Sequence, residues 1–92
     1  MVEDLGPRNA QVARLRKLLS DRATRRDAGV FVAEGVRCID GLFDRHANVR
    51  ALYIDADAHE RSGELRVRAE AAAIPVMQLA SGVGRRLGAT VT

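Results

Sequence analysis

The stretch that decides the fold is Arg25-Arg26-Asp27-Ala28-Gly29-Val30-Phe31-Val32-Ala33-Glu34-Gly35-Val36-Arg37. A basic segment runs through Gly29 into a short apolar run, which ends at Glu34-Gly35. Such a run of β-branched and aromatic residues predicts a buried strand over 30–33. Gly35 then allows a sharp turn into the next helix, with charged groups at the carboxyl end of the strand. Ligands bind at this edge in open α/β sheets, and the neighbouring arginines favour an anionic ligand.

Helices and strands alternate through the rest of the chain. Asn9 is a good N-cap for an amphipathic helix that ends near Ser20. The later predicted elements are a polar connection (21–28), a helix with an apolar stripe (Val36, Ile39, Leu42, Phe43), a strand (49–54), a helix (62–73), a strand (74–79) and a helix from Ser81 to Gly88. Alternation with short links predicts a three-layer α/β/α domain with a small, mostly parallel sheet.

The same patterns predict which aromatic and sulfur side chains are buried. Phe31, Phe43 and Tyr53 lie in apolar runs or stripes, so we expect them in the core rather than on a base-stacking surface. Cys38 lies near the stripe of the second helix and is expected to be a small buried hydrophobe.

Composition excludes several classes of protein. The 92 residues suit one small domain, and a hydrophobic content of 47% is too high for a disordered chain. No long apolar span or signal peptide occurs, so we expect a cytoplasmic protein that does not contact membranes. Cys38, His46 and His59 are isolated in sequence and show no metal-ligand spacing.

Positive charge is concentrated at the start of the chain. Residues 1–26 carry a net charge of +4 and residues 27–92 a net charge of −1. Fourteen of the fifteen basic residues are arginine, which favours bidentate contact with phosphate. A basic N-terminal third indicates nucleic-acid binding; a solvated helix face is the alternative.

One longer pattern resembles a known family. It comprises Asn9-x-x-Val12-x-x-Leu15-x-x-Leu18 followed by Arg22-x-x-Arg25-x-x-x-Gly29-x-Phe31-x-Ala33-Glu34-Gly35-x-Arg37. This pattern resembles the N-terminal substrate-binding domain of SpoU-type (TrmH-like) RNA 2′-O-ribose methyltransferases. Segments 49–54, 73–76 and 87–92 are compatible with the same family.

The resemblance implies a fold, an activity and a division into parts. The fold would be similar to that of RNA-binding ribosomal proteins. Residues 1–8 would be a tail, 9–88 the RNA substrate-binding domain, and 89–92 the start of a linker. The trefoil-knot catalytic domain, which binds S-adenosylmethionine and forms the homodimer, would be absent. This fragment would then hold no catalytic residue and no cofactor, although its parent is an enzyme of rRNA processing.

The expected RNA-binding residues surround the predicted strand. Arg22, Arg25, Arg26 and Arg37 would contact phosphates, and Gly35 would allow close approach of the RNA at a helix start. Glu34 would either accept hydrogen bonds from a base, or stabilise the helix start or pair with Arg37. The expected partner is ribosomal RNA, most simply that of the large subunit.

Two other functions and two weaker motifs remain as alternatives. The chain could be a stand-alone RNA-binding protein of the ribosomal type, or an α/β interaction module without a nucleic-acid ligand. Gly82-Val83-Gly84 weakly resembles a dinucleotide loop, but the third glycine is displaced. Asp55, Asp57, His59 and Glu60 form an acidic cluster for which solvated charges are the simpler interpretation.

Overall fold

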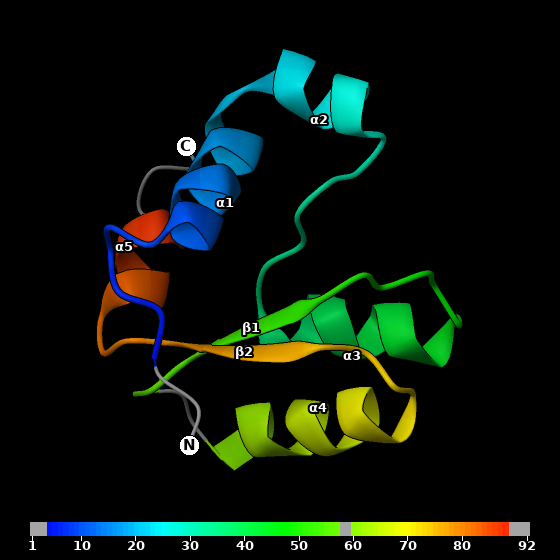
Figure 1. Cartoon of the computed structure of the whole chain (residues 1–92). Coiled ribbons are helices and arrows are strands. Elements are labelled where there is room, and N and C mark those ends of the chain that lie inside the picture. Colours follow the sequence, from blue (N-terminus) through cyan, green and yellow to red (C-terminus); the bar gives the residue numbers. More distant parts are fainter. Residues whose placement is uncertain (1–3, 58–59, 89–92) are drawn as a thin grey trace.

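A computed structural model describes residues 4–57 and 60–88. Figure 1 shows its helices and strands: three helices come first, and over residues 36–88 helices and strands alternate as the sequence predicts. In chain order they are α1 (Ala10–Ser20), α2 (Arg22–Ala28), α3 (Val36–Asp44), β1 (Leu52–Asp55), α4 (Glu60–Ala71), β2 (Val76–Leu79) and α5 (Val83–Gly88). No helix in the described ranges is long and apolar enough to cross a membrane.

The sheet is small and parallel. β1 pairs with β2 in a register that sets Leu52 opposite Val76 and Asp55 opposite Leu79. Leu5 adds a parallel bridge at Leu79, since its N–H donates to Gln78 and its carbonyl accepts from Ala80, both at 2.8 Å. The N-terminal segment is therefore held against the second edge of β2.

Alternate residues of the strands enter two separate cores, one on each face of the sheet. One core joins α1 and α5 to the sheet through Val12, Leu15, Leu79, Val83 and Leu87. The other joins α3 and α4 to it through Phe43, Leu52, Ile54, Leu65 and Ala69. Helices thus cover both faces of a parallel sheet, which confirms the predicted α/β fold class.

The strand predicted over 30–33 does not form. Residues 30–34 belong to no strand, although they link α2 to α3 as an open stretch of chain (Figure 1). The predicted connection at 21–28 is instead the helix α2, which stands apart from the sheet. The following residues span from this helix back to α3 without pairing with a strand, although Val32 packs against the core that joins α1 and α5 to the sheet.

Local capping explains why α2 is a helix. The Asp21 carboxylate accepts hydrogen bonds from the Ala23 N–H at 3.0 Å and the Thr24 hydroxyl at 2.9 Å. Gly29 closes the other end in the left-handed region, with φ of 68°. An N-cap aspartate and a C-terminal glycine are the ordinary signals of a short helix, and both are visible in the sequence.

Two predictions of burial were wrong. Phe31 is 72% exposed, because the run that contains it never joins the sheet. Cys38 is also exposed, since it lies on the solvent side of α3 rather than on its apolar stripe. Phe43 is buried as predicted, and Tyr53 is half-buried and packs on the core beside α1.

Candidate nucleic-acid interface

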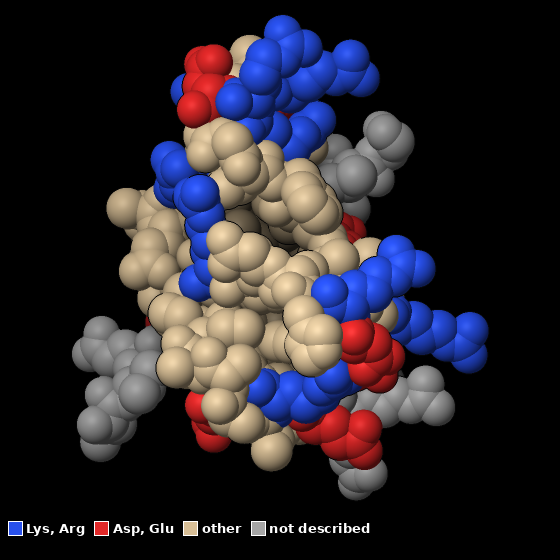
Figure 2. All heavy atoms as spheres, turned by 90° about the vertical axis from the view of Figure 1, so that its right-hand side faces the viewer, with Lys and Arg blue, Asp and Glu red and all other residues tan. Residues whose placement is uncertain are grey.

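The arginines of α2 form one end of the molecule. The side chains of Arg22 and Arg26 are exposed, and their guanidinium groups bond to no other described residue. Figure 2 shows Lys and Arg side chains gathered at the end of this face where Figure 1 places α2. The two arginines are therefore free to contact an anionic partner.

Arg25 has a different environment. It is half-buried, and its Nη1 donates to the Leu18 carbonyl at 2.6 Å and the Leu19 carbonyl at 3.1 Å. Both carbonyls lie in the last turn of α1, where backbone acceptors lack intrahelical donors. This guanidinium thus fixes α2 against the end of α1, a structural role that the sequence pattern did not reveal.

The start of α3 is open to solvent. Gly35 is the N-cap with φ of 93°, a region that favours glycine, and no side chain caps the helix. The first backbone bond of the helix runs from the Ile39 N–H to the Gly35 carbonyl at 3.0 Å. The preceding amides have no intrahelical acceptor, so this turn presents donors to the outside.

Glu34 and Arg37 flank this turn, and both are exposed. The possible ion pair between them does not form: both salt bridges of the described residues belong to Arg68, which binds Asp40 and Asp44. Glu34 also caps no helix amide, so its carboxylate is free to accept hydrogen bonds from a ligand.

Phe31 adds an aromatic ring that the sequence analysis assigned to the core. It lies in the stretch between the basic helix α2 and the open start of α3. No feature of the run Val30-Phe31-Val32-Ala33 distinguishes an exposed ring from a buried one. The exposure of this ring became visible only in the structure, where α2 leads the chain away from the sheet.

Asp55, the first residue of the acidic cluster and the last of β1, serves the fold. Asp55 accepts hydrogen bonds from the backbone N–H groups of Asp57 (2.8 Å), Gly84 (2.7 Å) and Gly82 (3.3 Å). Burial opposes its ionisation, but these three bonds and the charge of Arg85 together hold the pKa of Asp55 below its ordinary value. Asp55 therefore ties the end of β1 to the start of α5.

The contact with Asp55 also explains the glycine at position 84 in α5. Gly82 has a φ of 81°, and a Cβ at Gly84 would lie 3.1 Å from the Asp55 side chain.

Among the described residues no group of three His, Cys, Asp or Glu could hold a metal ion. His59 lies outside the described residues.

These features define a small three-layer α/β domain with an arginine-rich helix at one end. Residues 9–92 match the family model of the MRM3-like substrate binding domain. The chain belongs to this family of N-terminal domains of SpoU-type rRNA methyltransferases, as the sequence pattern predicted. Searches of curated proteins and of solved structures gave no match.

Proposed function

We propose that this chain is the RNA-recognition domain of an S-adenosylmethionine-dependent rRNA 2′-O-ribose methyltransferase and has no methyltransferase activity by itself. The family match over residues 9–92 is the observation that carries this proposal. It makes the chain a substrate-binding domain, and the exposed arginines of α2 agree with an RNA substrate.

Binding would combine charge, donors and stacking. Arg22, Arg26 and Arg37 would contact phosphates, which supply most of the affinity of such a domain. The open amides at Gly35 suit a phosphate or a base edge. Phe31 offers a ring on which an unpaired base can stack, a usual mode of single-strand RNA recognition. Glu34 lies between Phe31 and Gly35 in the sequence and would accept hydrogen bonds from a base amino group.

Other parts of the proposal concern the parent enzyme. S-adenosylmethionine binding, methyl transfer and homodimer contacts would belong to a separate catalytic domain. The substrate would be large-subunit rRNA, and the enzyme would act in the cytoplasm. The domain itself would bind no cofactor and no membrane.

Two binding measurements test the proposal. Fluorescence anisotropy should show that the chain binds a labelled hairpin of large-subunit rRNA more tightly than the DNA hairpin of the same sequence. Isothermal calorimetry with S-adenosylmethionine should show no heat of binding. Equal affinity for RNA and DNA would contradict the proposal that the domain recognises RNA. A micromolar complex with the cofactor would contradict the assignment of methyl-donor binding to another domain.

A further inference from the structure

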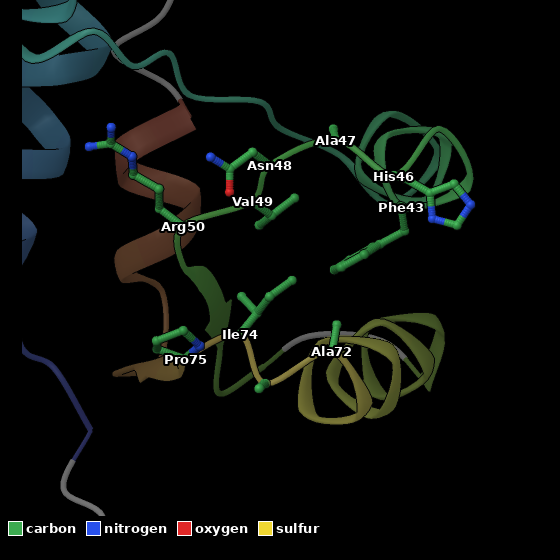
Figure 3. Close-up of a pocket in the computed structure, with 10 residues that line it drawn as sticks. Phe43, His46, Ala47, Asn48, Val49, Arg50, Ala72, Ile74 and Pro75 are labelled. Carbon is green, nitrogen blue, oxygen red and sulfur yellow. The ribbon is translucent and has the colours of Figure 1, made fainter.

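A cavity lies where the two parallel strands begin, at the end of the sheet opposite to Asp55. Parallel strands begin at the same edge, so the segment before β1 (45–51) and the segment before β2 (72–75) come together there. The Leu52 N–H donates to the Pro75 carbonyl at 2.9 Å and joins the two segments. Between them is a cavity of about 490 Å³, drawn in Figure 3.

The cavity has an apolar floor and a basic rim. Figure 3 shows the side chains of Phe43, Val49 and Ile74 turned toward one another, while Arg50 extends away from them. Asn48 and Arg50 are exposed, and the described residues that line the cavity include no carboxylate. This combination suits a ligand with an apolar face and a negative group beside it.

Arg68 holds the ring of Phe43 in place. The guanidinium of Arg68 lies 5.2 Å from the ring centroid, within the range of a cation–π contact. Arg68 is itself fixed by salt bridges to Asp40 and Asp44. The residues beneath the cavity are therefore ordered, and the Phe43 ring among them is only 9% exposed.

Two helices end at the rim, and both end in the same way. The Ala47 N–H bonds to the Leu42 carbonyl at 3.0 Å, and the Ile74 N–H bonds to the Ala69 carbonyl at 2.8 Å. The residues before them, His46 and Ala73, have φ of 55° and 59°. Helix carboxyl ends carry partial negative charge, so this rim favours N–H donors on a ligand.

We propose that the cavity accepts one unpaired nucleobase of the RNA substrate, with Arg50 on the adjacent phosphate. One face of a base would lie on the half-buried side chains of Val49 and Ile74, and its amino groups would face the helix ends. The cavity volume lies within the range of about 300–1,000 Å³ found for small-molecule sites. The inference rests on the proposed function, because the base is presented by the bound RNA.

The experiment combines nuclear magnetic resonance with RNA binding. Nucleoside 5′-monophosphates are titrated into ¹⁵N-labelled protein, with ribose 5-phosphate as the control that lacks a base. The amide signals of Ala47, Asn48 and Ile74 should shift with the nucleotides and not with ribose 5-phosphate. Affinity for a labelled single-stranded RNA of mixed sequence is measured by anisotropy in parallel.

Two pairs of variants localise the effect. Ala72 lines the cavity and is exposed, so Ala72→Leu fills it without loss of core; Ala71→Leu, at the exposed neighbouring position, is its control. Arg50→Gln is compared with Arg45→Gln, which is exposed and outside the cavity. Ala72→Leu and Arg50→Gln should each weaken RNA binding about five- to tenfold, a modest loss for one stacked base. Both controls should bind RNA as the wild type does.

The outcomes separate this inference from the proposed function. RNA binding that is unaffected by Ala72→Leu would overturn the base site, even if free nucleotides shift the amide signals. RNA binding without any amide shift at the cavity would overturn it as well. A wild-type chain that binds no RNA would instead contradict the proposed function.

Discussion

Replacing Arg25 with alanine separates a role in folding from a role in RNA binding. Its guanidinium donates two hydrogen bonds to α1 carbonyls, at 2.6 and 3.1 Å. A hydrogen bond to a charged group contributes about 1.5–3 kcal/mol, and partial exposure and the shared donor nitrogen reduce the sum. We expect Arg25→Ala to lower the free energy of unfolding by about 2 kcal/mol. For a domain of this size that lowers the thermal midpoint by about 8–16 °C.

Urea denaturation followed by circular dichroism measures this loss. Arg22→Ala and Arg26→Ala are matched controls on the same helix, and we expect each to change the free energy by less than about 0.5 kcal/mol. Arg25→Lys should recover only part of the loss, because one ammonium cannot reproduce the planar guanidinium. An Arg25→Ala variant as stable as the wild type would refute the structural role of this side chain.

Three further substitutions test the description of the fold and of the interface. Phe31→Ala should leave the free energy of unfolding within about 0.5 kcal/mol of the wild type but weaken RNA binding about five- to tenfold; a large loss of stability in urea would show a buried ring instead. Phe43→Ala should cost about 3–5 kcal/mol in the same assay, because this ring is only 9% exposed, and a loss below about 1 kcal/mol would contradict its place in the core. Asp55→Ala should cost about 1–2 kcal/mol at pH 7, like the loss of a helix cap. Folding lowers the pKa of Asp55, so its contribution is complete above the unfolded pKa of about 3.9 and is lost as the pH falls through the folded value. The difference between wild type and Asp55→Ala should therefore shrink as the pH falls below about 4, and a difference that stays constant would exclude the ionised cap.

The regular elements of the fold were predictable where the apolar residues are periodic. The stripes of α1 and α3 and the apolar runs at 49–54 and 74–79 all correspond to elements of the structure, with shifted ends. The family pattern was recognisable from individual residues within 9–37, and the family model covers residues 9–92.

Over residues 21–34 the sequence patterns did not predict the secondary structure correctly. The run at 30–33 has the composition of a buried strand, but whether it pairs depends on where the preceding helix leads the chain. The Asp21 and Gly29 caps of α2 are visible in the sequence, whereas the position of this helix away from the sheet is not. Tertiary position therefore decided both the missing strand and the exposure of Phe31.

The residue types of the candidate site were visible in the sequence, whereas their arrangement was not. Arginines near a glycine turn indicated anion binding, and Arg22, Arg26 and Arg37 are exposed as that function requires. The role of Arg25 at the end of α1 depends on a helix angle that no local pattern encodes. The cavity could not be predicted from the sequence either, because it is formed by two segments that are separated along the chain by β1 and α4.

The salt dependence of RNA binding is the most direct test of phosphate binding by the arginines of α2. Affinity for the rRNA hairpin is measured from 50 to 300 mM salt for the wild type, for Arg22→Ala/Arg26→Ala, and for the control Arg85→Ala/Arg86→Ala on α5. Each phosphate contact contributes about 0.7–0.9 to the slope of log K against log salt. If Arg22 and Arg26 contact phosphates, the α2 variant should lose about 1.5 from the magnitude of the slope, and the α5 variant should keep the wild-type slope. Equal losses in both variants, or no RNA binding by the wild type, would contradict phosphate binding by these arginines.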